Sequence, residues 1–262
     1  MRLISFQVDA FTDRLFSGNP AAVILTEEPL SDRLMQQIAG ENGLPETAFI
    51  LKQEESIQLR WFTPDLEMDL CGHATLAAAH VLFNELHLAD KQVEFETRSG
   101  ILRVTRGKKG AYRMEFPLRE AAPASLPPEI AESLSIAPLE IYKARDYLLV
   151  YAQQSDIESI QIDRQRFDQI NLGEGGVIVT APGKKCDFVS RFFTPQATIF
   201  EDPVTGSAHC TLTPYWAKRL RRNELRAQQL SKRGGTLRCS LTDEKVFIEG
   251  TAVTYCQGEL YL

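Results

Sequence analysis

A two-copy repeat constrains this chain more than any other feature of its sequence. The tripeptide FTP at residues 62–64 recurs half a chain length later at residues 193–195. In both copies a short turn of small residues follows, GHA at 72–74 and GSA at 206–208. A repeat of this length is too long for a solenoid unit. It therefore predicts two similar domains related by approximate twofold symmetry.

The pattern inside each copy predicts many short strands and one buried helix. Apolar and polar residues mostly alternate, as in strands. The helix after Gly72 is apolar nearly all round, which predicts burial, and the matching helix after Gly206 carries Pro214. The Pro- and Ala-rich segment 117–128 marks a boundary, so we expect domains of residues 1–120 and 121–262, with the last strand able to return to the first domain. Helices are predicted at 31–42, 72–85, 128–134, 164–171 and 206–222.

Composition excludes several classes of function. The chain has 262 residues, 44% of them hydrophobic, and a formal net charge of −6. Nucleic acids and anionic membranes bind basic surfaces, so neither is expected as a partner. The five cysteines are odd in number and form no CxxC pair, and the N-terminus lacks a signal-peptide pattern. These features predict a protein of the reducing cytoplasm with free thiols.

The two small-residue turns are the best candidates for a ligand site. A helix start exposes unpaired backbone N–H groups and the positive end of the helix dipole. Helices starting at Gly72 and Gly206 would each offer donors to an anion, and a pseudo-twofold axis would make them face each other. The acids Asp69, Glu201 and Asp202 adjoin the turns. The arrangement suits a carboxylate or a developing enolate, and the alternative is two ordinary capped helices.

Metal and cofactor motifs are not evident in the sequence. His73 and His80 lie on one helical face, but the spacing offers no third ligand, so no metal site is expected. His80 is interpreted as a core histidine, and His209 and Cys210 point in different directions from their helix. The segment GEGGVIV lacks the glycine and helix pattern of a dinucleotide site, and no lysine is marked for a pyridoxal cofactor.

Four ordered motifs resemble one family. GNPAAV, ETAF, DLCGHAT and EDPVTGSAH are similar, in order and spacing, to the PhzF-like (phenazine biosynthesis-like) proteins of the diaminopimelate epimerase and proline racemase superfamily. The resemblance implies an α+β fold of two pseudo-symmetric domains, each a β-barrel-like sheet around a central helix, with the active site in the cleft. It also implies a homodimer and an isomerase that works without a cofactor on a small carboxylate-bearing metabolite.

The resemblance also assigns roles to residues. Glu46 matches the family's catalytic glutamate, which moves a proton between carbons of the substrate. Its implied partners in substrate positioning and proton handling are Asp202, His73 and Ser207. The candidate substrate-binding residues are Asn19, Gly72, Gly206 and Asp69, the last because it adjoins the first turn.

One departure from the superfamily bears on mechanism. Two-cysteine racemases place a cysteine at each helix start, whereas this chain has Cys71 at the first and Thr205 at the second. A threonine hydroxyl is not a base near neutral pH, so a two-cysteine racemase is disfavoured and Cys71 is interpreted as a packed residue. Two alternatives stay open: a non-catalytic small-molecule-binding or interaction protein, and a racemase or epimerase that uses Cys71 with another base.

Overall fold

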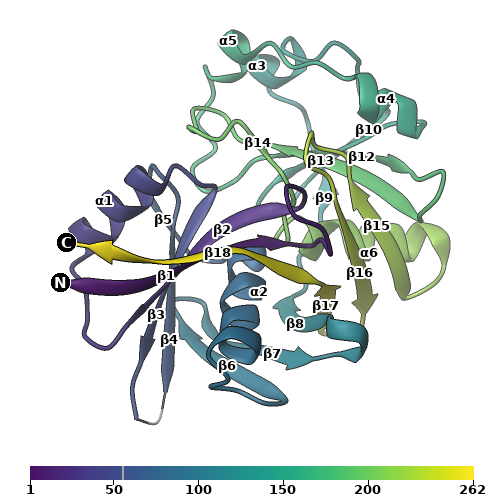
Figure 1. Cartoon of the computed structure of the whole chain (residues 1–262). Helices are drawn as coiled ribbons and strands as arrows, with labels where there is room; N and C mark the ends of the chain where they lie inside the picture. The colour runs from purple at the N-terminus through teal and green to yellow at the C-terminus, as the bar shows by residue number, and fades with distance from the viewer. Residues whose placement is uncertain (55) are drawn as a thin grey trace. The chain divides into compact units, whose positions relative to one another are not determined.

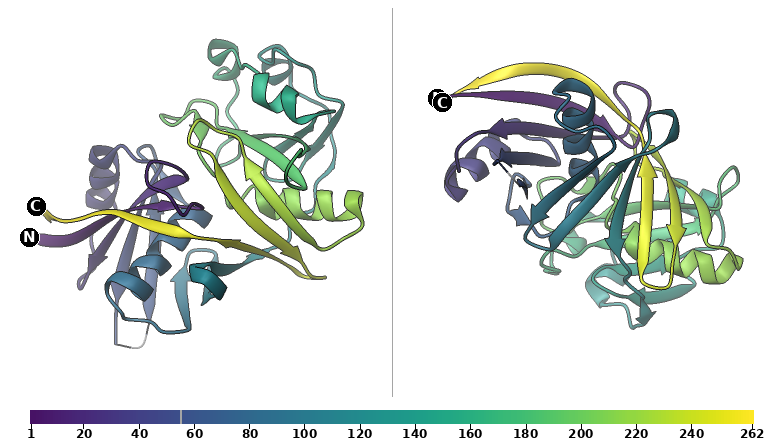
Figure 2. Two further views of the ribbon diagram at one scale, coloured as in Figure 1. Left: turned by 45° about the vertical axis from the view of Figure 1, so that its right-hand side comes forward. Right: turned by 90° about the horizontal axis from the view of Figure 1, so that it is seen from below.

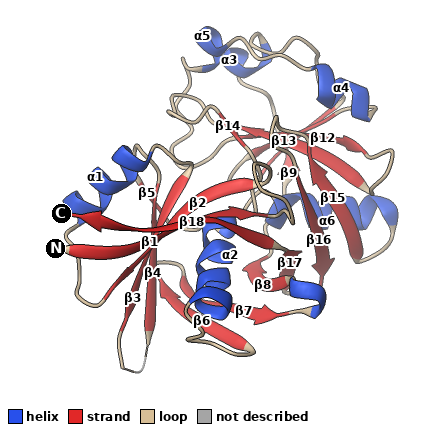
Figure 3. Ribbon diagram, viewed as in Figure 1, coloured by secondary structure: helices blue, strands red, loops and turns tan. Residues whose placement is uncertain are grey.

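A computed structural model of the chain describes residues 1–54 and 56–262 and divides them into two compact units (Figure 1). Unit 1 comprises residues 1–116 and 247–262, and unit 2 comprises residues 117–246. Strands make up most of the regular structure in both units, as Figure 3 shows. Within these described residues, no helix is both long enough and apolar enough to span a membrane.

The strands of unit 1 come from both ends of the chain. They are β1 (Arg2–Ala10), β2 (Asn19–Thr26), β3 (Glu46–Lys52), β4 (Ile57–Phe62), β5 (Glu67–Met68), β6 (Gln92–Thr97), β7 (Gly100–Arg106), β8 (Tyr112–Pro117), β17 (Lys245–Gly250), which begins just before the boundary, and β18 (Ala252–Tyr261). β18 pairs antiparallel with β1 along its length, so the two termini lie side by side (Figure 2). The end of the chain is thus part of the first unit's sheet.

The strands of unit 2 repeat the pairing pattern of unit 1. In unit 1, β1–β2 is antiparallel, β2–β3 parallel, β3–β4 antiparallel, β4–β5 antiparallel, β4–β6 parallel and β6–β7 antiparallel. The same series recurs in β10 (Glu140–Lys143), β11 (Tyr147–Val150), β12 (Val177–Pro182), β13 (Phe188–Phe193), β14 (Glu201–Asp202), β15 (Glu224–Gln229) and β16 (Gly235–Leu241). β9 (Ala122–Pro123) pairs with β10. The predicted duplication is therefore confirmed at the level of strand order and direction.

A matching ion pair marks the repeat at the level of side chains. In unit 1, Arg60 of β4 donates from Nε and Nη2 to the two carboxylate oxygens of Glu67, at 2.7 and 2.8 Å. In unit 2, Arg191 of β13 makes the same two bonds to Glu201, at 2.7 and 2.9 Å. Each pair ties a long strand to the short strand that returns toward the helix. The geometry of the approach to each helix is thus built in the same way twice.

Each unit has one helix that is mostly buried. All nine residues of α2 (Gly72–His80) are buried, and α2 contacts β1, β2, β3 and β18 before it continues as a π-helical turn, η1 (Val81–Glu85). α6 (His209–Leu220) is buried over most of its length and contacts β15 and β16. An apolar helix with no polar face is stable only when it is surrounded in this way.

The remaining helices are short or peripheral. They are α1 (Asp32–Asn42), capped by the hydroxyl of Ser31, a 3₁₀ turn η2 (Lys108–Gly110), α3 (Pro128–Ala131), α4 (Gln154–Ser159) and α5 (Arg164–Phe167). The helices predicted at 128–134 and 164–171 are each only a single turn, and α4 was not predicted. Of these, α3, α4 and α5 pack on an apolar core in unit 2 that includes Ile130, Ile157 and Phe167. Packing against that core stabilises turns that would be too short to form alone.

Candidate functional site

The glycine before β2 positions Asn19. Gly18 has φ +68°, and a Cβ there would lie 2.2 Å from the carbonyl oxygen of Ala10. Only glycine fits this close approach of the backbone without strain. The turn delivers Asn19 as the first residue of β2, fully buried, with its Nδ2 3.0 Å from Nδ1 of His73.

Glu46 opens β3, the strand parallel to β2. Its Oε2 lies 3.0 Å from Nε2 of His73, and the exposed fractions of the two side chains are 13% and 3%. Neither atom meets hydrogen-bond geometry with any described residue, so the contact is a close approach of charge rather than an aligned bond. Glu46, His73 and Asn19 therefore form one cluster, in which the imidazole lies between a carboxylate and an amide.

The first turn of α2 carries His73 into this cluster. Cys71 precedes the helix with an extended backbone and no side-chain cap, and the N–H of Thr75 makes the first helical bond to the carbonyl of Cys71 at 3.2 Å. The N–H groups of Gly72 and His73 therefore have no acceptor within the helix. The positive end of the helix dipole and these donors favour a negative charge beside Glu46.

Burial and nearby charge set the protonation of this cluster. Burial raises the pKa of the Cys71 thiol to about 11, and the charge of Glu46 adds to the rise. Burial lowers the pKa of His73, but the charges of Cys71 and Glu46 outweigh it and raise the value well above its usual range. Because a thiol with that pKa is neutral near pH 7, Glu46 is the charge that favours the imidazolium there.

Cys71 extends the cluster on the Nδ1 side of the imidazole. Its Sγ lies 3.6 Å from Nδ1 of His73. One ligand atom each from Glu46, Cys71 and His73 lie within 4.8 Å of one another, and together they could hold a metal ion. The spacing of residues along the chain does not reveal this trio, because Glu46 lies on β3 whereas Cys71 and His73 lie at the start of α2.

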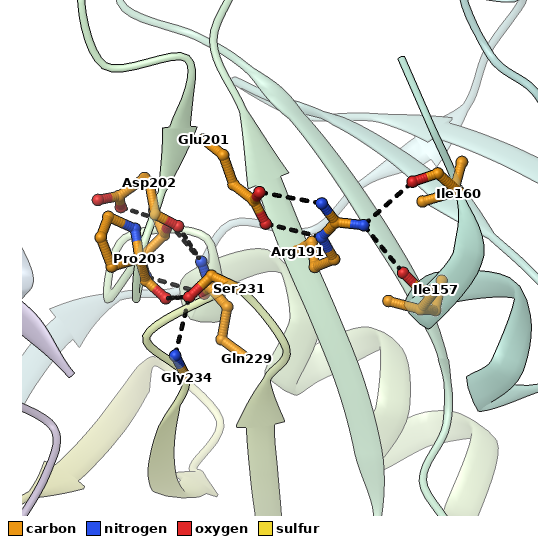
Figure 4. Close-up of polar contacts among 10 residues, drawn as sticks. Ile157, Ile160, Arg191, Glu201, Asp202, Pro203, Gln229, Ser231 and Gly234 are labelled. Atoms are coloured by element: carbon orange, nitrogen blue, oxygen red, sulfur yellow. Dashed lines mark hydrogen bonds and ion pairs between the residues drawn. The ribbon is translucent and has the colours of Figure 1, made fainter. Parts of the chain in front are cut away.

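In unit 2 a second polar cluster surrounds Asp202 and Thr205. The hydroxyl of Thr205 donates to Oδ2 of Asp202 at 2.5 Å. Gln229, which is 1% exposed, accepts from the N–H of Thr205 at 2.9 Å and donates to the carbonyl of Asp202 at 2.7 Å. Figure 4 shows Asp202 and Gln229 beside the pair of Arg191 and Glu201. The turn that carries Asp202 is thus held from two strands, β14 and β15.

Ser207 is held by an arginine that the sequence did not single out. Arg145 donates from Nη2 to Oγ of Ser207 at 3.0 Å and approaches Oδ1 of Asp146 with Nε at 3.4 Å. Asp146 is fully buried and accepts from the N–H of Gly176 at 2.9 Å. A chain of polar contacts therefore runs from the β10–β11 turn to the segment that precedes α6.

The helix expected from Gly206 begins at His209. His209 and Cys210 donate from their backbone N–H groups to the carbonyls of Gly206 and Ser207, at 3.0 and 3.1 Å, which makes a tight turn before α6. His209 is fully buried, and its Nδ1 lies 2.8 Å from the carbonyl oxygen of Thr205. Both His209 and Cys210 are packed inside unit 2.

The predicted site residues fall into two groups, one in each unit. Unit 1 brings together four of them, Asn19, Glu46, Gly72 and His73. Asp69, also in unit 1, is half-buried, and its carbonyl accepts from the hydroxyl of Ser99 at 2.8 Å. In unit 2, Asp202, Gly206 and Ser207 lie on one short segment. That the two groups act on one substrate stays a prediction.

Arg145, Asp146 and Gln229 were missed because their sequence context is ordinary. A charged pair before a buried strand usually lies in a solvated turn, and a glutamine at the end of a strand carries no motif. The one available signal was GEGG. A Cβ on Gly175 would lie 2.9 Å from the carbonyl of Arg145, so Gly175 permits the close packing of the Arg145 turn. His80 is satisfied inside unit 1, since its Nδ1 lies 2.9 Å from the hydroxyl of Tyr112.

Comparisons with known proteins agree with this architecture. The family model for phenazine biosynthesis-like protein (PhzC-PhzF) matches residues 8–258. A Pseudomonas aeruginosa protein named as an uncharacterized isomerase is 46% identical over the full length of both chains. The crystal structure of a PhzF-family protein from Enterococcus faecalis covers both chains completely, with 45% identity and a TM-score of 0.93.

A more distant likeness confirms the predicted fold class. The structure of a hydroxyproline epimerase from Agrobacterium vitis covers 99% of this chain and 92% of its own, with a TM-score of 0.68. At 9% identity this likeness concerns the fold alone. The diaminopimelate epimerase-like fold expected from the motifs is the fold of this protein. By its sequence and its structure, the chain belongs to the phenazine biosynthesis-like (PhzC-PhzF) family.

Proposed function

We propose that this protein is an isomerase that moves a proton between carbons of a small carboxylate-bearing metabolite, with Glu46 as the proton-transferring group and no cofactor. The observation that carries the proposal is the position of Glu46. Its carboxylate is mostly buried, lies 3.0 Å from Nε2 of His73 and adjoins the start of α2. Relatives that are 42–46% identical over nearly their whole length are named isomerases, which supports the reaction class.

Each group near Glu46 has a part in the proposed step. Glu46 takes a proton from a carbon that is activated by the substrate's carboxylate or an adjoining unsaturated system, and returns it to another carbon. His73 stabilises the ionised carboxylate between transfers, and Asn19 fixes the orientation of the imidazole. The N–H groups of Gly72 and His73 stabilise the negative charge that develops on the substrate.

The second cluster supplies the other end of the site in this proposal. Asp202, held by Thr205 and Gln229, and Ser207, held by Arg145, position the substrate and handle its exchangeable protons. Asp69 and Gly206 complete the proposed set of substrate-binding residues. A homodimer in the cytoplasm is part of the same proposal.

Proton exchange with solvent tests the proposal directly. The protein is incubated in D₂O with a panel of small unsaturated carboxylates, and deuterium at carbon is measured by mass spectrometry. We expect Glu46→Gln to lower exchange by about 10²–10⁴-fold, the usual contribution of a general base, with ligand binding largely retained. The matched control is Glu41→Gln, which changes an exposed glutamate of α1. Full exchange in Glu46→Gln would remove Glu46 from the mechanism.

Two alternatives give different results in the same experiment. A non-catalytic binding or interaction protein on this scaffold would bind a carboxylate without any incorporation of deuterium. A racemase that uses Cys71 would lose exchange in Cys71→Ser and retain it in Glu46→Gln. The neutral state of the buried Cys71 thiol near pH 7 favours Glu46 as the base, because the thiolate is the reactive form of cysteine.

A further inference from the structure

Three side chains that ligate soft divalent metal ions meet at the start of α2. They are a thiol, an imidazole and a carboxylate, from Cys71, His73 and Glu46, and one ligand atom of each lies within 4.8 Å of the other two. Cys71 and His73 are 4% and 2% exposed. Such a buried trio differs from the clusters of exposed acids that occur on many protein surfaces without binding an ion.

The separations of the ligand atoms can be compared with those of a tetrahedral zinc site. Bonds of about 2.3 Å to sulfur and about 2.0–2.1 Å to nitrogen and oxygen place neighbouring ligand atoms roughly 3.4–3.6 Å apart. Sγ of Cys71 is 3.6 Å from Nδ1 of His73, and Oε2 of Glu46 is 3.0 Å from Nε2, so the two residues contact different nitrogens of the ring. The three ligand atoms lie within 4.8 Å of one another, so an ion at Nε2 requires the side chain of Cys71 to move toward that nitrogen.

The surroundings of His73 favour coordination through Nε2. Asn19 lies 3.0 Å from Nδ1 and is fully buried, so it holds the ring while Nε2 faces Glu46. A metal-bound histidine usually donates from its second ring nitrogen to an acceptor, so this support requires the amide oxygen of Asn19, rather than its nitrogen, to face Nδ1 when the ion is bound. Nε2 of His73 and Oε2 of Glu46 have no other hydrogen-bond partner among the described residues, so both atoms are available to an ion.

We infer that Glu46, Cys71 and His73 form a binding site for a soft divalent cation such as Zn²⁺, Co²⁺ or Cd²⁺. Cys71 binds as the thiolate and His73 as the neutral imidazole, and the proton that each group loses passes to solvent as the ion binds. Three protein ligands leave a fourth position for water or for a carboxylate ligand. The ion coordinates the carboxylate of Glu46 and prevents it from accepting a proton from the substrate, so it inhibits the isomerase. The inhibition rests on the proposed function, whereas the binding rests on the geometry alone.

Cobalt binding in the absence of any substrate tests the site. The reduced protein is titrated with Co²⁺ without oxygen, and thiolate-to-cobalt charge-transfer absorption is recorded. We expect this absorption to saturate at one ion per chain, to be displaced by Zn²⁺, and to be lost in Cys71→Ser. Glu46→Gln is expected to weaken cobalt binding by about tenfold or more, because it removes a charged ligand.

The exposed thiol of Cys256 provides the matched control, because it is the cysteine most open to adventitious metal. Cys256→Ser is expected to bind cobalt as the wild type does. Absorption that persists in Cys71→Ser, or that is lost in Cys256→Ser, would overturn the inference. If Cys71→Ser does not fold, Glu46→Gln decides, and cobalt binding equal to that of the wild type overturns the site.

Inhibition is measured separately, as the loss of deuterium incorporation when Zn²⁺ is added. Zinc that binds and also stops exchange supports both parts of the inference. Cobalt binding to a protein without any exchange activity would retain the metal site and reject the proposed function. Exchange that continues at saturating Zn²⁺ would overturn the inhibitory role.

Discussion

Arg145 holds the hydroxyl of Ser207 with a 3.0 Å hydrogen bond from Nη2, and its Nε faces the fully buried carboxylate of Asp146. One guanidinium thus connects a buried acid to the segment before α6. Removal of the guanidinium leaves Asp146 without its countercharge and Ser207 without its donor. The effect on Asp146 concerns stability, and the effect on Ser207 concerns the proposed site.

We expect Arg145→Ala to lower the free energy of unfolding by about 1–3 kcal/mol, the usual cost of leaving a buried charged group without its partner. The side chain is 18% exposed, which places the estimate below the range for fully buried pairs. Urea unfolding measures the effect, and Arg238→Ala, at an exposed position of β16, is the control. Equal stability of Arg145→Ala and the control would contradict the structural role.

The two copies of the ion pair allow a comparison within one molecule. Arg191 also donates from Nη1 to the carbonyls of Ile157 and Ile160, at 3.1 and 3.2 Å, whereas Arg60 instead makes a second ion pair to the exposed Asp32. Arg191→Ala therefore leaves the two carbonyl groups and the carboxylate of Glu201 without the donor that Arg191 provides. We expect Arg191→Ala to lower the free energy of unfolding by about 2–4 kcal/mol, and Arg60→Ala to lower it by about 1–2 kcal/mol.

Chemical denaturation of both variants checks this order. Because the chain has two units, the unfolding of each is followed separately, for example by hydrogen exchange of amides in β4 and β13. A larger loss in Arg60→Ala than in Arg191→Ala would show that the carbonyl bonds contribute little.

Gln229 is expected to fix the turn that carries Asp202. Its amide accepts from the N–H of Thr205 and donates to the carbonyl of Asp202 and, at 3.1 Å, to the hydroxyl of Thr205. Gln229→Leu keeps the volume but leaves these groups unpaired in a buried place. We expect Gln229→Leu to lower the free energy of unfolding by about 2–4 kcal/mol and to speed hydrogen exchange of the Thr205 amide. Unchanged exchange at Thr205 would show that the turn does not depend on Gln229.

The sequence predicted the parts of this molecule that repeat or that follow a strong local rule. The buried helix over 72–85 was evident from its run of apolar residues, and the strand-end FTP tripeptides revealed the duplication. The start of α6 was placed too early, because a run of small residues is compatible with both a helix and a tight turn. Only the bonds back to Gly206 and Ser207 distinguish the two.

Side-chain clusters built from distant segments could not be predicted from the sequence. Cys71 and His73 are near neighbours in the sequence at the start of α2, but the third residue of the trio, Glu46, lies on β3, and no spacing rule connects it to them. Arg145, in the β10–β11 turn, and Gln229, at the end of β15, likewise contact the segment before α6 from positions 62 and 24 residues away in sequence. Their positions follow from strand register, which a single sequence specifies only weakly.

His209 makes the stability of unit 2 depend on pH. Burial lowers the pKa of His209 to about 4, although the carbonyl of Thr205 opposes the shift. The unfolded chain binds a proton at this site below about pH 6.5, while the folded chain does not until about pH 4. The unfolded state therefore binds more protons in this window, and stability falls as the pH falls from about 6.5 to about 4.

The lost stability should reach about 3 kcal/mol at the lower end of the window, from a difference of roughly 2.5 pH units at 1.36 kcal/mol each. Urea unfolding of unit 2 between pH 4 and 8 measures it. His209→Asn is the reference, because its amide can still donate to the carbonyl of Thr205 but does not titrate. We expect the difference in stability between the wild type and His209→Asn to be constant above pH 7 and to fall steadily below pH 6.5. Parallel pH profiles for the two proteins would show that His209 is protonated as readily in the folded chain as in the unfolded one.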